Sequence, residues 1–244
     1  MPRTVATIEA RMTSTRLPGK VLKEAVGKPM LELMIERLRR APSLDGIVVA
    51  TTTNAADAPV AALAERLGVG LWRGSEDDVL SRVLEAAIHH RIDVIVETTG
   101  DCPLIDPAAV EDCIRVYRAA KVDYVSNVLE RSYPVGMDTQ VFSASILADV
   151  ARRTIDPADR EHVSFYIYRH PEIYSRRNVP APPALKRPDL ALTLDTPEDY
   201  RLIGAVFEAL YPKNPAFTLA DVLALLDRRP EIAAMNAHVR RKKV

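Results

Sequence analysis

The chain has 244 residues, of which 48% are hydrophobic and 27% are charged, as is typical of a globular protein with a sizeable core. Lysine plus arginine equals aspartate plus glutamate, 33 each, so no overall basic field indicates a nucleic-acid partner. The apolar runs are well short of the roughly 18 residues that a membrane span needs, and no signal-type segment opens the chain. Two cysteines exclude a disulfide framework. We therefore expect a cytoplasmic protein without a membrane span.

The first half of the chain alternates apolar strands with amphipathic helices. Strands are predicted at residues 5–8, 46–52, 69–72 and 93–99, and helices from residue 29, around 60–67, over 76–90 and from residue 107. Continuous apolar strands that alternate with such helices are typical of a parallel sheet covered on both faces. The pattern predicts a Rossmann-like α/β fold.

This rhythm changes after residues 124–126. Further strands are predicted at 138–142 and 190–195, and helices at 143–152, 157–170, from Pro197 and from Thr218. Residues 178–189 contain four prolines and are expected to be extended, and the basic tail 240–243 is expected to fray.

The loop after the first strand concentrates cations and hydroxyls. Arg11, Arg16 and Lys20 lie within ten positions, with Ser14 among them and a Pro-Gly turn just before the lysine. Arginine forks and a lysine point charge, placed where a strand ends, suit a polyphosphate. The loop lacks the glycine and the hydroxyl residue that a Walker loop requires. The alternative is a solvated basic turn.

Two aspartates follow predicted strands. Asp101 ends the strand at 93–99, and Asp195 ends the strand at 190–195. Ligands bind beyond the carboxyl ends of parallel strands, and a carboxylate pair suits Mg²⁺, which shares itself with substrate phosphates. The alternatives are a turn-forming role for Asp101 and a helix cap for Asp195.

Three motifs in order resemble those of the cytidylyltransferases that activate acidic sugars, such as the 3-deoxy-manno-octulosonate and acylneuraminate enzymes. They are Ala10-Arg11 with residues 14–20 (STRLPGK), residues 100–104 (GDCPL), and residues 195–199 (DTPED). Cys102 departs from the family, in which an acid is common there. Stretches 133–138, 160–163 and 236–239 are most similar to the branch of the spore-coat polysaccharide biosynthesis protein SpsF.

The resemblance implies a nucleotidyltransferase domain over 1–244, with a nucleotide-binding half (1–125), a small acceptor and dimerisation insertion (126–190) and a closing strand with C-terminal helices (191–244). It implies a homodimer and Mg²⁺ bound by Asp101 and Asp195. The implied catalytic residues are Arg16, Lys20, Asp101 and Asp195, and the implied nucleotide-binding residues are Arg11, Ser14, Arg16, Lys20, Ser75 and Asp78.

The acceptor side is expected in the second half, at Asp138, Arg160, Glu161 and His162. His162 is a candidate general base, with a surface histidine as the alternative, and Ser75 is equally well read as a helix cap. The expected activity is Mg²⁺-dependent transfer of CMP from CTP to a sugar or sugar acid for surface polysaccharide or glycan synthesis, with release of pyrophosphate. Guanylyl transfer and a non-catalytic nucleotide-sugar-binding domain are the alternatives, and the donor base, acceptor and pathway stay open.

Overall fold

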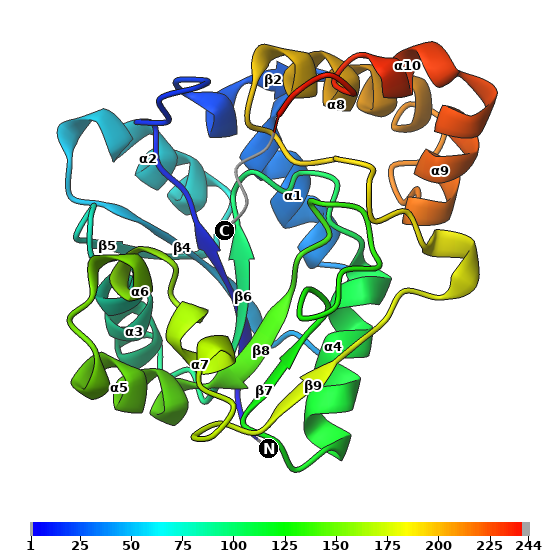
Figure 1. Ribbon diagram of the computed structural model, residues 1–244. Coiled ribbons are helices and arrows are strands. Elements are labelled where there is room, and N and C mark those ends of the chain that lie inside the picture. The colour runs from blue at the N-terminus through cyan, green and yellow to red at the C-terminus, as the bar shows by residue number, and fades with distance from the viewer. Residues whose placement is uncertain (1, 241–244) are drawn as a thin grey trace.

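A computed structural model describes residues 2–240, which form one main sheet and ten α-helices (Figure 1). In spatial order the sheet consists of β5 (Gly70–Gly74), β4 (Gly46–Thr52), β1 (Thr4–Glu9), β6 (Val94–Thr99), β8 (Gln140–Ser143), β7 (Tyr124–Ser126) and β9 (Arg176–Asn178). Strands β5, β4, β1 and β6 run parallel, β8 is antiparallel to β6 and β7, and β9 is parallel to β7. The predicted mostly parallel α/β sheet is confirmed, and β8 is its reversed strand.

The central parallel strands end level with one another. Ile8 of β1 lies beside Val49 of β4 and Thr98 of β6. The loops that follow β1, β4, β5 and β6 therefore open along one side, here called the carboxyl edge. Parallel sheets bind their ligands at this edge.

Helices cover both faces of the sheet, as predicted (Figure 1). Alternate residues along β1 point to opposite faces, so Ala6 and Ile8 join one apolar cluster while Val5 joins the other. The first face carries α1 (Met30–Leu38), α2 (Ala58–Arg66) and α4 (Pro107–Ala119), and the second carries α3 (Val79–His89), α5 (Ala144–Arg153), α6 (Pro157–Glu161) and α7 (Phe165–Arg169).

The C-terminal helices build a third apolar cluster. They are α8 (Pro197–Leu210), α9 (Leu219–Arg228) and α10 (Pro230–Ala234), at the top right of Figure 1. Their buried side chains pack with Met30 and Leu33 of α1 and with Leu192. Capping boxes at Thr196 and Thr218 begin α8 and α9 where the sequence predicted helix starts.

The predicted closing strand at 190–195 is wrong. Only Ala191 forms a bridge, with Val135, and the segment is otherwise an extended loop. Its backbone N–H groups at Leu192 and Leu194 donate to the carbonyls of Val135 and Asp101. The alternating leucines are buried as in a strand, but the neighbouring segments are loops, so no ladder forms.

Smaller differences concern helix and hairpin boundaries. The helix predicted over 157–170 is two short helices, because Val163 between them adopts a φ of 35°. A short hairpin of β2 (Glu24–Ala25) and β3 (Lys28–Pro29) precedes α1, and 3-10 turns occur at Lys20–Leu22, Ala55–Asp57 and Pro183–Leu185. Residues 241–243 of the basic tail lie outside the described residues. Within residues 2–240, no helix is long and apolar enough to cross a membrane.

Candidate active site

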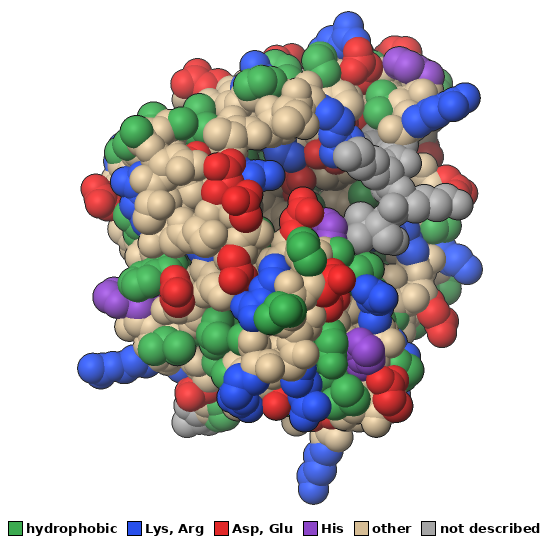
Figure 2. All heavy atoms as spheres, turned by 60° about the vertical axis from the view of Figure 1, so that its left-hand side comes forward, with side chains coloured by type: hydrophobic (Ala, Val, Ile, Leu, Met, Phe, Trp, Pro, Cys, Tyr) green, Lys and Arg blue, Asp and Glu red, His purple; other side chains and the backbone are tan. Residues whose placement is uncertain are grey.

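Four loops bring charged side chains to the carboxyl edge. Residues 10–19 follow β1, 53–57 follow β4, 75–78 follow β5 and 100–101 follow β6. The face shown in Figure 2 is hollowed near its centre, and acidic and basic side chains meet around the hollow.

Lys20 is the centre of an ion-pair network. Its Nζ lies 2.8 Å from Asp101 Oδ2 and 2.9 Å from Asp195 Oδ1, and Arg16 Nη2 lies 3.0 Å from the same Asp195 oxygen. The Lys20 side chain is only 13% exposed, whereas that of Arg16 is 42% exposed. The four residues that the sequence predicted as catalytic are thus brought together.

The network fixes the charge of its members. Burial alone would lower the pKa of Lys20, but the carboxylates of Asp101 and Asp195 outweigh it and raise that pKa. Burial would likewise raise the pKa of Asp101, yet the Lys20 ammonium and hydrogen bonds hold it below its ordinary value. The site therefore holds a carboxylate and an ammonium, both charged at neutral pH.

Asp195 reaches Asp101 because the loop before it is tied to the β6 loop. Leu194 N donates to Asp101 O at 2.8 Å, and Thr193 Oγ1 donates to the same carbonyl at 3.3 Å. On the other side, Asp195 N donates to the buried Asp199 carboxylate, which belongs to the capping box of α8. Asp195 is thus held from both sides and does not cap the helix itself.

Arg11 lies in a second cluster around Glu76. Its Nη1 is 3.0 Å from Glu76 Oε1, and Thr13 Oγ1 donates to that oxygen at 2.6 Å. The Asn54 amide donates to the other oxygen. Hydrogen bonds from Thr13 and Asn54, followed by the charge of Arg11, lower the pKa of Glu76. Donors from two loops converge on one carboxylate, a set that would also suit a phosphate oxygen.

The remaining predicted nucleotide-binding residues take local roles. Ser14 Oγ accepts from Leu17 N at 3.5 Å within the first loop. Ser75 Oγ accepts from Asp78 N, and Asp78 caps α3 by accepting from Ser81 N at 2.9 Å. The helix-cap alternative thus describes the segment, with Asp78 and not Ser75 as the cap.

The predicted acceptor residues lie in different hydrogen-bond groups. Arg160 Nη1 lies 3.3 Å from Asp78 Oδ2, so it is tied to the start of α3. Asp138 forms a two-pronged pair with Arg131 at 2.8 and 2.9 Å. Glu161 and His162 are exposed. Across residues 2–240, no hydrogen bond or ion pair joins Asp138 to the other three.

The sequence reasoning missed an acid pair behind the site, in which Glu97 is buried and Glu9 is half-buried. Glu9 ends β1 and Glu97 lies in β6, and both face the side of the sheet covered by α3 and α7. Burial raises the pKa of Glu97 to about 8; burial and then the charge of Glu97 raise the pKa of Glu9. The charge of Arg82 of α3 acts in the opposite direction and lowers the pKa of Glu9. The available signal was an acid inside an otherwise apolar strand.

The donor set for a metal is small. No group of three or more His, Cys, Asp or Glu side chains in the described part of the chain is placed to hold a metal ion. Asp101 and Asp195 nevertheless converge on a single cation, the Lys20 ammonium. Two carboxylates fit Mg²⁺ if substrate phosphates and water supply its other oxygen ligands.

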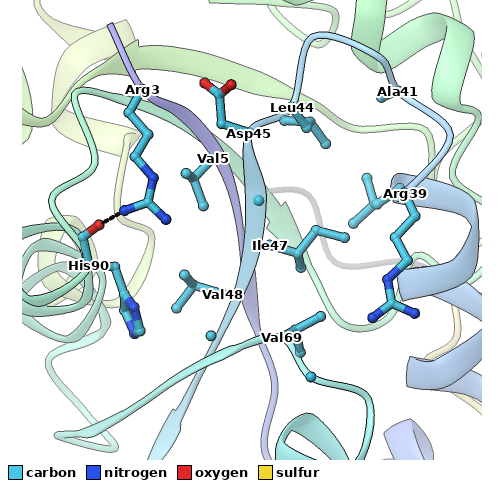
Figure 3. A pocket seen from close by; sticks show the side chains of 14 residues that line it. Arg3, Val5, Arg39, Ala41, Leu44, Asp45, Ile47, Val48, Val69 and His90 are labelled. Atoms are coloured by element: carbon cyan, nitrogen blue, oxygen red, sulfur yellow. Dashed lines mark hydrogen bonds between the residues drawn. The ribbon is translucent and has the colours of Figure 1, made fainter.

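A separate pocket of about 330 Å³ opens at the opposite, amino edge of the sheet (Figure 3). Arg3 and Arg39 stand on its two sides, and Val5 and Val48 form part of its floor. Arg3 donates to the carbonyl of His90 at the end of α3, and Arg39 donates to the carbonyl of Leu67 at the end of α2. None of the residues predicted for function lines this pocket.

Comparisons with known proteins agree with the geometry. A family model described as cytidylyltransferase matches residues 5–220. The chain is 33% identical to the uncharacterized protein MJ1063 of Methanocaldococcus jannaschii, covering 98% of this chain and 96% of that protein. It is 32% identical to the spore coat polysaccharide biosynthesis protein SpsF of Bacillus subtilis, with 93% and 95% covered. A solved cytidylyltransferase from Leptospira borgpetersenii superposes with a TM-score of 0.91 over 100% of both chains, at 28% identity.

Proposed function

The chain belongs to the cytidylyltransferase family, and we propose that it transfers CMP from CTP to a sugar or sugar-acid acceptor and releases pyrophosphate. The observation that most strongly supports this proposal is that four charged side chains converge at the carboxyl edge: Arg16, Lys20, Asp101 and Asp195. The resemblance to enzymes of acidic sugars supports the acceptor class. The SpsF relative is named for spore coat polysaccharide biosynthesis, which supports surface polysaccharide synthesis as the pathway.

In this proposal the cations of the first loop bind the triphosphate. Arg11 and Arg16 are each 42% exposed and pair with carboxylates, so phosphate oxygens can replace those partners without desolvating a new charge. Lys20 sits deeper and would neutralise charge where the reaction occurs. Ser14, Ser75 and Asp78 border the same loops and would shape the nucleotide space.

Asp101 and Asp195 would hold Mg²⁺. When bound there, the ion would neutralise charge on the phosphate oxygens and polarise the reacting phosphorus. The two carboxylates are already aimed at one point, and the Lys20 ammonium holds the pKa of Asp101 below its ordinary value, so the protein contributes a preformed pair of ligands.

The chemistry is an in-line displacement. An acceptor oxygen forms a bond to the α-phosphorus while the bond from that phosphorus to the bridging oxygen of pyrophosphate breaks. Such a transfer depends on positioning and charge neutralisation more than on covalent catalysis. Asp138, Arg160, Glu161 and His162 stay predictions for the acceptor side, with His162 as the candidate base. The homodimer also stays a prediction, which sedimentation in solution would test.

The first test is a thermal shift experiment with CTP, GTP, UTP and ATP, each with and without Mg²⁺. A ligand that binds only the folded state stabilises it by about 2.7 kcal/mol at one hundred times its dissociation constant. We expect the largest shift with CTP and Mg²⁺, followed by pyrophosphate release with a sugar acid such as 3-deoxy-manno-octulosonate.

A matched pair of variants locates the binding. Lys20→Met should abolish the CTP shift, whereas Lys28→Met should keep it, because Lys28 of β3 pairs with Glu36 of α1 and with Tyr211 at the end of α8. A selective GTP shift would favour guanylyl transfer. Nucleotide binding without pyrophosphate release from any acceptor would favour the non-catalytic alternative, and no shift at all would refute the triphosphate role of the first loop.

A further inference from the structure

Asp57 stands at the N-cap of α2 but does not cap it. Aspartate is favoured at this position because its carboxylate normally accepts from backbone N–H groups of its own helix. No side-chain cap hydrogen bond is present at α2, although Pro59 follows within the first turn as at many helix starts. When a residue departs from its local preference in this way, its side chain has a role elsewhere in the structure.

The Asp57 carboxylate instead binds the loop that follows β1. Its Oδ1 accepts from Met12 N at 2.6 Å, and its Oδ2 accepts from the Thr52 hydroxyl at the end of β4. That hydroxyl in turn accepts from Asn54 N at 3.1 Å. The carboxylate therefore joins the first loop to the end of β4.

Asp57 is fully buried. A buried carboxylate is stable only when hydrogen bonds satisfy it, and a bond from a backbone N–H to a charged oxygen is among the stronger ones. Loss of the carboxylate would leave the Met12 N–H without an acceptor in the interior. The loop would then favour conformations in which this N–H is exposed to water, where it can form a hydrogen bond.

Met12 is the point where the loop's shape is set. Its carbonyl accepts from Gly19 N at 2.9 Å, and Gly19 adopts a φ of 67° as the chain turns back toward Lys20. Met12 also directly follows Arg11. One residue thus anchors both ends of the cation-bearing loop, and Asp57 anchors that residue.

We infer that Asp57 is a positioning residue, which holds the loop of Arg11, Arg16 and Lys20 in its ligand-binding shape from beneath without touching the ligand. The inference about the loop stands on the hydrogen bonds, and its consequence for nucleotide affinity rests on the proposed function. A preformed loop loses less conformational freedom when it binds a ligand. Loss of the preformed shape should therefore weaken the complex with nucleotide.

The test compares Asp57→Ala with Asp106→Ala, since alanine removes the acceptor whereas asparagine would keep an amide oxygen for the Met12 N–H. Asp106 is also buried and its carboxylate also accepts from backbone N–H groups, at Ala108 and Leu219, but it joins α4 to α9. Hydrogen exchange reports local opening residue by residue. We expect Asp57→Ala to speed exchange of the Met12 amide at least about tenfold relative to wild type, and Asp106→Ala to leave it within about twofold.

The second readout is the dissociation constant for CTP with Mg²⁺. It should rise about fivefold or more in Asp57→Ala and stay within about twofold in Asp106→Ala, while kcat at saturating CTP changes less than KM. If Asp57→Ala does not fold, Thr52→Val, which removes one partner of the carboxylate, should shift both readouts in the same direction by less.

The two inferences fail separately. Unchanged Met12 exchange in Asp57→Ala, or an equal change in Asp106→Ala, would overturn the positioning role. Faster exchange of the Met12 amide in the variant, together with no nucleotide binding by the wild-type protein, would support the positioning role of Asp57 and contradict the proposed function. Faster exchange with unchanged CTP affinity would show that the loop's shape does not limit binding, and would overturn its link to the nucleotide.

Discussion

The two edges of the sheet both carry arginines and carboxylates, but they use them differently. At the carboxyl edge, Lys20 and Arg16 pair with the side chains of Asp101 and Asp195, which come from distant parts of the chain. At the amino edge, Arg3 and Arg39 donate to main-chain carbonyls where α3 and α2 end.

The difference distinguishes the candidate ligand site from a pair of arginines that stabilise helix ends. A guanidinium at a helix C-terminus satisfies orphan carbonyls and opposes the negative end of the helix dipole. Moving the guanidinium away from that carbonyl lowers the stability of the protein, so the guanidinium is not readily available to bind a ligand. A side-chain carboxylate, in contrast, can be exchanged for a phosphate oxygen of the same charge. The partners of the cations therefore favour the carboxyl edge as the candidate site, and the volume of the amino-edge pocket does not outweigh them.

The largest expected effect is that of Asp101→Asn, which tests whether the carboxyl edge is the site of reaction. It removes one of the two charges paired with Lys20, and we expect pyrophosphate release to fall at least about a hundredfold while the protein stays folded. Arg3→Gln at the amino edge should keep turnover within about twofold. Equal turnover in Asp101→Asn and wild type would remove the carboxyl edge from the mechanism.

Gly136→Ala tests how the Asp195 segment is held. Gly136 has a φ of 99°, and an added Cβ would lie 2.7 Å from the backbone carbonyl of Leu192. We expect a loss of about 2–4 kcal/mol in the free energy of unfolding, measured by urea denaturation, with lower turnover because Asp195 shifts.

Gly204→Ala is the control for this variant, because nothing lies within 4 Å of its added Cβ and it sits inside α8. It should be neutral or more stable by up to about 1 kcal/mol. Similar losses in both variants would contradict the close approach at Gly136.

Glu97→Gln tests the buried acid behind the carboxyl edge. With a folded-state pKa of about 8 against an ordinary value of 4.5, Glu97 holds a proton in the folded protein that the unfolded chain releases. Wild-type stability should therefore fall as pH rises from about 5 to 8, and Gln, which cannot ionise, avoids that loss.

The free energy of unfolding of Glu97→Gln, relative to wild type, should thus rise by about 2 kcal/mol or more over this interval. Denaturant titrations at several pH values would measure it, with the exposed Glu208→Gln as control. A difference that stays flat with pH would contradict the raised pKa.

The smallest expected effect is that of Arg39→Ala. Loss of its bond to the α2 carbonyl should cost about 0.5–1 kcal/mol of stability and leave turnover unchanged. Reduced turnover at full nucleotide saturation would mean that the amino edge is coupled to the reaction.

Local signals predicted the parts of the fold that are locally determined. Thr196 and Thr218 cap the helices that they were expected to begin, and the apolar runs at residues 46–52 and 93–99 are strands. The failure at 190–195 has a different origin. Alternating leucines require an extended, half-buried backbone, which the segment has, but a strand also needs a partner edge that its own residues do not encode.

The same limit applies to the site. Residue types and motif order selected Arg16, Lys20, Asp101 and Asp195, and the fold brings these four together. Glu76 and Asp57 were missed because the sequence does not show which distant N–H or cation each of them meets. Glu97 was visible as an acid within an apolar strand, but the burial that raises its pKa is a property of the packed interior.

The ion-pair network of Lys20 also sets a condition on synthesis of the chain. Lys20 and Asp195 are 175 positions apart, so a ribosome must release most of the protein before the two can meet. Until then, the lysine and the first aspartate form at most half of the network. A growing chain therefore lacks the complete four-residue network until Asp195 has left the ribosome. The last part of the chain to be made completes a site whose first cations are among the first residues made.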